Sequence, residues 1–315
     1  MPAVARIDPK TVFTPEEWSR LTSRSSWRGM WLVVHTWGTI AGSIALVRLW
    51  PNPLTWLLAV MIVGTRQLGL AILVHEAAHG GLHANKAINE FVGQWLCAVP
   101  VGADLESYRS YHLQHHRFTQ QPEDPDLSLS APFPISKESY RRKAIRDLTG
   151  QTFVKQRLPL FLSLFRPADK DTPVDHESFV STGREKMARF LAVNALMFVL
   201  FWLAGAGLWF FGIWLVGMAT WLSLVARMRN IAEHACTSTG KDPFSHARTT
   251  RASPIERALI APYWVNYHAE HHLFMHSPCY RLPEAHRLLV GKGLIKRMEV
   301  RSGYLDVMKL ATSRS

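Results

Sequence analysis

The sequence predicts an all-α integral membrane protein, with four transmembrane helices in two hairpins and a cytoplasmic helical cap that carries histidine motifs. Three observations support this prediction. Apolar residues make up 48% of the 315 residues, whereas charged residues make up only 19%. Four long apolar segments each approach the roughly 17–25 residues that a helix needs to cross the hydrocarbon core of a bilayer. The 15 histidines are concentrated in a few short motifs rather than scattered.

The apolar segments form two pairs, each joined by a short turn. The predicted spans are residues 31–48, 54–74, 188–204 and 208–226. The first pair is joined by residues 49–53 (LWPNP) and the second by residues 205–207 (GAG). Proline and glycine at these positions are typical of turns. Each pair is therefore predicted to form a helical hairpin.

The distribution of Lys and Arg predicts which parts face the cytoplasm. The net charge is +12, yet neither turn contains a basic residue. Nearly all basic residues lie in segments 1–26, 104–187 and 227–315. By the positive-inside rule these three segments face the cytoplasm and the turns face outward. We therefore expect one membrane domain over residues 1–315, with its histidine motifs on the cytoplasmic side.

Two shorter features interrupt this pattern. Residues 94–102 (QWLCAVPVG) are apolar but too short to span the bilayer, so a re-entrant or interfacial segment is expected. Arg66 and Gln67 lie within the second span. A charge at such a depth usually faces the protein interior or a cavity.

Composition argues against several other classes of site and partner. The three cysteines, Cys97, Cys236 and Cys279, are odd in number and have no C-x-x-C spacing. Neither a disulfide framework nor a thiolate metal site is therefore predicted. Basic residues are not interleaved with aromatic residues in a recognisable nucleic-acid motif, so no nucleic-acid partner is expected.

Three histidine motifs predict a metal site. They are HEAAH at residues 75–79, HLQHH at 112–116 and HAEHH at 268–272. Residues three or four apart lie on the same side of a helix, so each motif aims two or more imidazoles in one direction. These eight histidines and His234 all fall on the side expected to be cytoplasmic. Nine imidazoles suit two metal ions, although imidazole alone does not identify the metal.

The first motif also matches the H-E-x-x-H pattern of zinc proteases, in which Glu76 would be the catalytic base. A catalytic zinc takes only three ligands from the protein. The protease hypothesis therefore leaves the other two motifs without a role. A membrane metal carrier without enzymatic activity is a third hypothesis.

The three motifs resemble the histidine boxes of the membrane fatty acid desaturase and hydroxylase superfamily. The order and spacing of the boxes, Asp124-Pro125-Asp126 after the second box and Asn230-x-x-x-His234 are similar too. One departure is Met275, where relatives commonly have proline. The resemblance implies a non-haem di-iron centre, with Asn230 in contact with one iron through water. The implied iron ligands are His75, His79, His112, His115, His116, His234, His268, His271 and His272.

The resemblance implies an O2-dependent enzyme that introduces a double bond into the acyl chain of a membrane lipid. A hydroxylase or ketolase acting on a fatty acid, sphingoid base or carotenoid is the alternative on the same fold. Metal-bound histidines usually donate their second N–H to a carboxylate or carbonyl. The expected carboxylates are Glu76, Asp124, Asp126, Glu233 and Glu270.

The electrons for such a reaction are expected to come from a separate protein. The sequence has no C-x-x-C iron–sulfur spacing, and the Gly205-x-Gly207 turn leads into an apolar span rather than a dinucleotide-binding loop. A donor of the ferredoxin or small cytochrome type is implied. Such donors are often acidic, so the basic segment 140–146 (YRRKAIR) is a candidate docking site.

Overall fold

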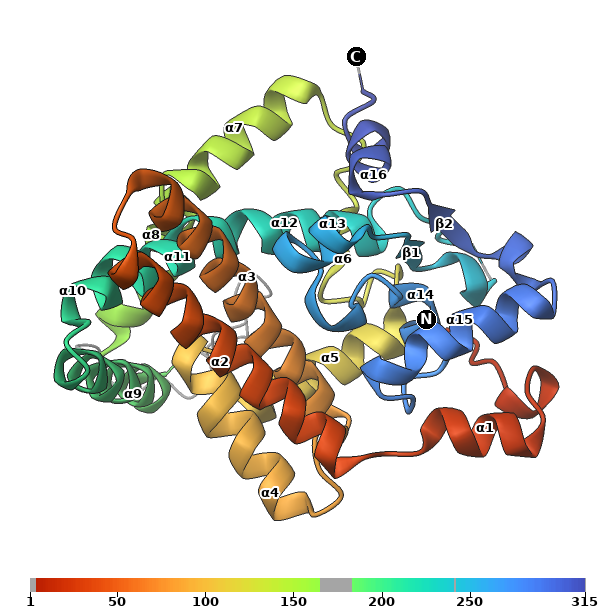
Figure 1. Cartoon of the computed structure of the whole chain (residues 1–315). Coiled ribbons are helices and arrows are strands. Elements are labelled where there is room, and N and C mark those ends of the chain that lie inside the picture. Colours follow the sequence, from red (N-terminus) through yellow and green to blue (C-terminus); the bar gives the residue numbers. More distant parts are fainter. Residues whose placement is uncertain (1–3, 165–182, 241, 315) are drawn as a thin grey trace.

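The computed structural model describes residues 4–164, 183–240 and 242–314, and most of these residues are helical (Figure 1). Parts of the predicted cytoplasmic segments, namely residues 1–3, 165–182, 241 and 315, lie outside the described residues. Two short strands, β1 (Arg248–Thr250) and β2 (Glu299–Arg301), pair in parallel and are an addition to the predicted all-α class.

Four helical segments are long and apolar enough to cross a membrane, as the sequence predicted. They are Pro15–Leu49, Pro53–Ala78, Arg184–Leu203 and Gly207–His234. The first contains α1 (Pro15–Thr22) and α2 (Ser26–Leu49), the second is α3 (Pro53–Ala78) and the third is α9 (Arg184–Leu203). All four overlap the predicted spans; the first segment begins well before its predicted span because it includes α1, and the fourth continues beyond its predicted span to His234.

The fourth segment is irregular, which the sequence did not predict. It consists of α10 (Gly207–Trp209), a π-helical stretch (Phe210–Leu215), α11 (Val216–Ala219) and α12 (Trp221–His234). Thr220 separates α11 from α12, with φ −116° and ψ −77°. A π-helical stretch and a break shift the direction of the side chains that follow, and these include His234 at the end of α12.

The turn between α2 and α3 follows from its residues. Asn52 caps α3, because its side chain accepts the backbone N–H groups of Leu54 and Thr55, and Pro53 occupies the first helical position. After the turn, α3 packs along α2 (Figure 1). Arg48 at the end of α2 donates a hydrogen bond to the Ala204 carbonyl, which joins this turn to the end of α9.

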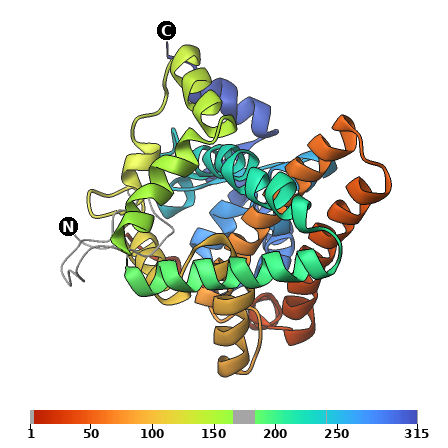
Figure 2. The same cartoon turned by 90° about the vertical axis from the view of Figure 1, so that its left-hand side faces the viewer.

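Large apolar side chains are exposed on α9, which runs across the direction of α2 and α3 in Figure 2. They include Leu196, Leu200 and Leu203, whose exposed fractions are 58%, 55% and 77%. Such a surface is unfavourable in water and suits contact with lipid chains. Together with the four apolar helices, it indicates a membrane protein.

The remaining helices of the described residues are shorter. They are α4 (Lys86–Phe91), α5 (Leu105–Phe118), α6 (Leu127–Ser130), α7 (Lys137–Leu148), α8 (Gln151–Ser163), α13 (Pro254–Leu259), α14 (His268–Leu273), α15 (Leu282–Gly291) and α16 (Tyr304–Ala311). The short apolar stretch expected to be re-entrant is helical. It consists of a π-helical segment (Val92–Ala98) and a 3-10 turn (Val99–Val101) that ends at Gly102, which has φ +74°.

Close packing of α3 brings the histidine motifs together. α3 contacts α5 on one side and α12 on another. Gly64 permits the approach of α12, because a Cβ atom at this position would lie 2.8 Å from Trp221 Cβ and 3.0 Å from the Leu222 nitrogen. The last turn of α3, which carries His75, therefore lies between the helices that carry the other motifs.

Candidate metal centre

The nine histidines predicted from the sequence lie together in two groups. Within each group, one ring nitrogen from every histidine lies within 4.8 Å of the others. Group A contains His75, His79, His112, His116 and His271, and group B contains His115, His234, His268 and His272. The structure therefore brings together all the predicted ligands and divides them five to four.

Each H-x-x-H-H motif contributes to both groups, which is a finer arrangement than the sequence predicted. In α5, His112 and His116 enter group A and His115 enters group B. In α14 the roles are reversed, because His268 and His272 enter group B and His271 enters group A. Successive residues of a helix are rotated by about 100°, so positions i and i+4 differ by about 40° and position i+3 lies on the other flank. The two helices consequently bridge the two groups.

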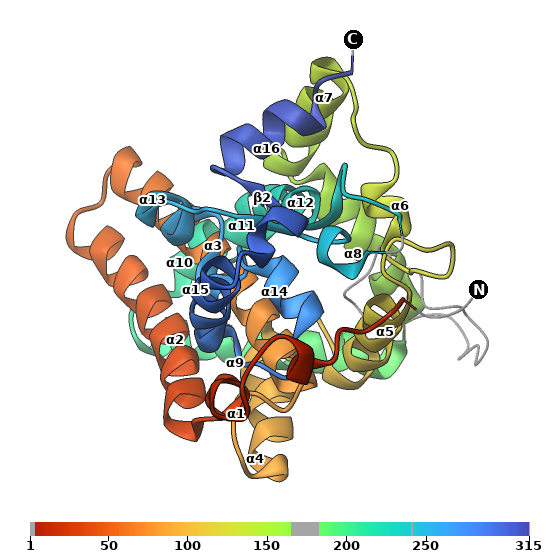
Figure 3. The same cartoon turned by 90° about the vertical axis from the view of Figure 1, so that its right-hand side faces the viewer.

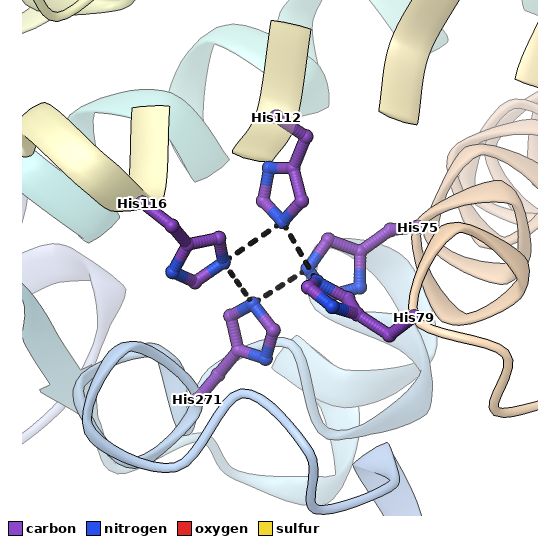
Figure 4. Close-up of side chains that lie close together, drawn as sticks. All are labelled: His75, His79, His112, His116 and His271. Atoms are coloured by element: carbon purple, nitrogen blue, oxygen red, sulfur yellow. Dashed lines mark hydrogen bonds between the residues drawn. The ribbon is translucent and has the colours of Figure 1, made fainter. Parts of the chain in front are cut away.

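The ring nitrogens of each group point toward a common centre, as Figure 4 shows for group A. There Nε2 of His116 lies 2.9 Å from Nε2 of His112 and 2.8 Å from Nε2 of His271. The Nε2 atoms of His75 and His271 are also 2.8 Å apart. In group B, Nε2 of His268 lies 2.9 Å from that of His234 and 3.0 Å from that of His272. Either a shared proton or a metal ion must lie between nitrogens held so close together.

The partners of the outer ring nitrogens, Nδ1, indicate what lies between the Nε2 atoms. Nδ1 of His115 lies 2.8 Å from an oxygen of Asp124, and Nδ1 of His234 lies 3.1 Å from the carbonyl oxygen of His246. Carboxylate and carbonyl oxygens only accept, so each Nδ1 carries a proton, and in the neutral ring that a metal ligand requires each Nε2 presents a lone pair. These two Nε2 atoms face each other at 3.1 Å. Two facing lone pairs repel unless a cation lies between them, so the donor set of group B fits a metal ion.

Five of the six histidines on α5 and α14 are neutral, as metal ligands must be. At His115 burial opposes the charged form, but the contacts with Asp124 and Asp126 outweigh it and raise the pKa. Burial lowers the pKa of His112 and His116 well below its usual value, and the neighbouring histidines lower it further. Burial and neighbouring histidines have the same effect on the pKa of His271. A neutral imidazole keeps a lone pair available for coordination.

The spacing of the nitrogens bears on the geometry of coordination. Metal–nitrogen bonds to histidine are about 2.0–2.1 Å long. Neighbouring nitrogens in these groups lie 2.8–3.2 Å apart, and all the nitrogens of a group lie within 4.8 Å of one another, so those of one group are close enough to share an ion.

Four of the five predicted carboxylates lie behind ligand histidines. Besides Asp124, an oxygen of Glu76 lies 3.5 Å from His75 Nδ1, and an oxygen of Glu233 lies 3.4 Å from His268 Nδ1. An oxygen of Asp126 lies 3.6 Å from His115 Nδ1. Carboxylates in this position orient the ring and increase its basicity.

Glu270 departs from this pattern. Its carboxylate accepts hydrogen bonds from Nδ1 of His286, at 2.5 Å, and from the Thr249 hydroxyl group. Glu270 is fully buried and joins α14 to α15 and β1. It therefore holds the helix that carries three of the histidines.

Sequence reasoning missed three contributors to the site. Arg229 is buried and donates to Glu233 through Nε at 2.6 Å, an i,i+4 pair on α12 whose spacing was visible in the sequence. His286 supports α14 through Glu270. His246 acts through its backbone carbonyl, for which the sequence holds no signal.

Two small cavities adjoin the groups on either side of Tyr108, Arg229 and His268. The first has a volume of about 30 Å³ and is lined by Asn230 as well as by His234. The second has a volume of about 20 Å³ and reaches His75 and His271. Each has room for one or two water molecules. Asn230 therefore lies beside group B, where a water molecule would fit.

Comparison with known proteins agrees with this geometry. Residues 51–296 match the family model for fatty acid desaturase. The chain is 28% identical over 249 residues to dihydrorhizobitoxine desaturase of Bradyrhizobium elkanii, which covers 74% of this chain and 68% of the relative. It is 28% identical over 224 residues to sphingolipid delta(4)-desaturase of Drosophila melanogaster, and this match covers 70% of this chain and 61% of the relative. It is 23% identical over 269 residues to zeaxanthin 4-ketolase of Chlamydomonas reinhardtii, and this match covers 84% of this chain and 51% of the relative. Because the family model matches well over half of its residues, this chain belongs to the fatty acid desaturase family and is an oxidoreductase.

Proposed function

We propose that this protein is an O2-dependent di-iron oxidoreductase that introduces a double bond into the acyl chain of a membrane lipid. The observation that carries the proposal is the pair of histidine groups with lone pairs directed inward, in a chain of the desaturase family. The nine histidines of groups A and B would hold the two ions, five for one and four for the other. Asn230 would contact the ion of group B through water.

Iron is the metal that suits both the ligands and the reaction. Imidazole binds iron, zinc, copper and nickel, but zinc does not change its oxidation state. When bound, two irons would supply the redox chemistry by which O2 attacks an unactivated C–H bond.

The residues of the chain hold this centre and separate it from water. Asp124, Glu76 and Glu233 fix the orientation of the histidines that they face. The ring of Tyr108 stacks on His112, with centroids 5.2 Å apart, and closes one side of group A. Exclusion of water protects a reactive centre from side reactions. The two cavities are too small for an acyl chain, so substrate binding must widen them.

A lipid substrate is supported by the exposed apolar helices and by the family. The desaturase names of two relatives, one of them a sphingolipid desaturase, agree with this reading. We further propose that the helices form two hairpins and that the histidine groups face the cytoplasm, because the basic residues lie in the cap and not in the turns.

Hydroxylation or ketone formation is the second candidate, and the similarity to zeaxanthin 4-ketolase favours it. Both reactions begin with attack on a C–H bond, and the position of the substrate decides the product. A zinc protease receives no support from the geometry. Glu76 lies on the Nδ1 side of His75 and accepts the backbone N–H of Cys279, so it faces away from the ring nitrogens that meet in group A.

The test is expression in a host that lacks such enzymes, followed by mass spectrometry of its lipids under air and with an electron donor supplied. Loss of two hydrogen atoms with a new double bond supports desaturation, whereas gain of one oxygen atom supports the second candidate. Metal analysis of the purified protein should give about two irons per chain. Absence of any new lipid with both irons bound and a reductant present would refute the proposal.

A further inference from the structure

A third cavity has a volume of about 190 Å³. Its walls come from residues 4–7 and Pro9 of the N-terminal segment, Trp18 of α1, the end of α5, Pro243 and His246, and residues 272–276, which begin in the last turn of α14. Figure 3 shows α1, α5 and α14, which contribute to these walls. The N-terminal segment is held beside α5 because Val4 donates its N–H to the Arg117 carbonyl, at 3.0 Å. This cavity is much larger than the two that adjoin the metal groups.

The inner wall of the cavity includes one histidine from each metal group. His116 of group A and His272 of group B both line it, and their ring centroids lie 4.4 Å apart. His246 lines it too, and its carbonyl accepts the Nδ1 proton of His234 in group B. If both groups held ions, an electron that arrived in this cavity would meet a ligand of each ion directly.

The mouth of the cavity is positively charged. Arg6 and His276 line it, and exposed Arg117 lies beside the N-terminal segment. Partial burial lowers the pKa of His276, and the charges of Arg24 and Arg6 lower it further, so His276 is neutral near pH 7 and the positive charge of the mouth comes from the arginines. Within the described part of the chain, Arg6, Arg24 and Arg117 form no ion pair. The cavity lining contains no acidic side chain.

Apolar side chains accompany these charges. Ile7, Leu273 and Met275 line the cavity and are each half-buried. An apolar centre with a charged rim is the composition of a protein-binding surface. Electron-transfer partners make small and short-lived contacts of this kind, and charge attraction gives them fast association.

The reaction requires such a partner. Reduction of one O2 to two waters takes four electrons and four protons. Formation of the double bond breaks two C–H bonds and supplies two of each, so two electrons must come from elsewhere and two protons from water. A one-electron carrier is oxidised twice in each turnover and the metal centre is reduced twice, with no bond to the carrier made or broken.

We propose that the basic mouth formed by Arg6, Arg24 and Arg117 is the docking surface for an acidic one-electron carrier protein. The inference rests on the proposed function, because that reaction is what creates the need for electrons. It places the carrier over His116 and His272, at the point where both metal groups come nearest to this cavity.

The basic segment on α7 is the rival surface, and the sequence alone favoured it. α7 packs against α12 and α8 and contributes no residue to any of the three cavities. Figures 1 and 3 show it at the far end of the molecule from α1. Its exposed Arg141 and Arg142 make a matched control, because reversing them changes the net charge as much as reversing Arg6 and Arg117 does.

The experiment measures binding of a plant-type [2Fe–2S] ferredoxin, used as an acidic probe, to the full chain in lipid nanodiscs by surface plasmon resonance. The double variant Arg6→Glu/Arg117→Glu should lower the affinity at least about tenfold, because like charges now meet at the rim. The control Arg141→Glu/Arg142→Glu should change it less than about twofold. Binding should weaken as ionic strength rises, and basic cytochrome c should not bind.

Stopped-flow reduction of the metal-loaded protein separates docking from chemistry. The first double variant should slow reduction by ferredoxin about tenfold or more and leave reduction by dithionite unchanged. Arg6→Gln/Arg117→Gln should give an intermediate rate and guards against a folding defect.

Two outcomes would overturn the docking surface. One is unchanged affinity in the Arg6 and Arg117 variants, and the other is an equal or larger loss in the α7 variant. If docking behaves as expected but dithionite-reduced protein forms no product from any lipid, the proposed reaction fails and the docking surface stands.

Discussion

Several histidines of the two groups have a partner at the outer ring nitrogen, Nδ1, which orients the ring. These partners are of different kinds. His115 faces a carboxylate, His234 a backbone carbonyl and His272 the hydroxyl of Thr119, 3.3 Å away. Residue type and spacing predicted the nine histidines because a ligand must be an imidazole at a fixed position on a helix. Their supports were less predictable, since a carbonyl or a hydroxyl from a distant segment can replace a carboxylate.

Asp124→Asn should weaken metal binding in group B without unfolding the protein. The amide NH2 can donate to Nδ1 of His115, which would move the ring proton to Nε2 and remove a ligand lone pair. We expect metal affinity about 10–100-fold lower, measured by competition with a chelator. Glu106→Gln, an exposed position on the same helix, is the control. Equal metal affinity in both variants would mean that Asp124 does not orient His115.

His234→Ala should remove one ion and leave the other. His234 belongs to group B alone, and group A keeps all five of its histidines. Metal analysis should therefore fall from about two ions per chain to about one. His276→Ala, which changes an exposed histidine outside both groups, should retain both ions. Loss of both ions from His234→Ala would show that the groups form one inseparable site.

At the scale of helices, the sequence predicted the spans within a few residues and missed their irregularities. The length of an apolar segment can be read directly from the sequence, so α2, α3 and α9 lie close to their predicted bounds. The π-helical stretch before α11 and the break at Thr220 depend on contacts with other helices, which a local pattern does not contain. The division of each H-x-x-H-H motif between two groups likewise became visible only once α5 and α14 faced each other.

Gly64→Ala should separate α3 from α12 and destabilise the protein. The added methyl group would lie 2.8 Å from Trp221 Cβ and 3.0 Å from the Leu222 nitrogen, and a backbone atom cannot move aside alone. We expect a loss of about 1–3 kcal/mol, seen as a lower thermal unfolding midpoint in detergent, with weaker metal binding. Gly42→Ala on α2, where no atom lies within 4 Å of the new Cβ, should cause no loss. An unchanged unfolding midpoint in Gly64→Ala would show that α3 and α12 can move apart at this contact without loss of stability.

The whole molecule combines exposed apolar helices with basic segments outside them. Trp31 and Trp50 are exposed near the two ends of the apolar part of α2, and the helical rise places them about 28 Å apart. This matches the roughly 30 Å thickness of the hydrocarbon core, whose two interfaces favour tryptophan. Composition predicted the apolar and basic parts. It did not predict the cavity beside the N-terminal segment, which forms only where residues 4–9 meet α5 and α14.

Orientation in the membrane decides whether the proposed docking surface faces its partner. In a Cys236→Ser background, where the other two native cysteines are buried, Pro51→Cys reports on the first turn and Glu138→Cys on the cap. By the positive-inside rule, a membrane-impermeant maleimide should label Pro51→Cys in intact cells and Glu138→Cys only after permeabilisation. The background protein should remain unlabelled in both conditions. The reverse pattern would place the histidine groups and the basic cavity outside the cell, beyond the reach of a cytoplasmic electron carrier.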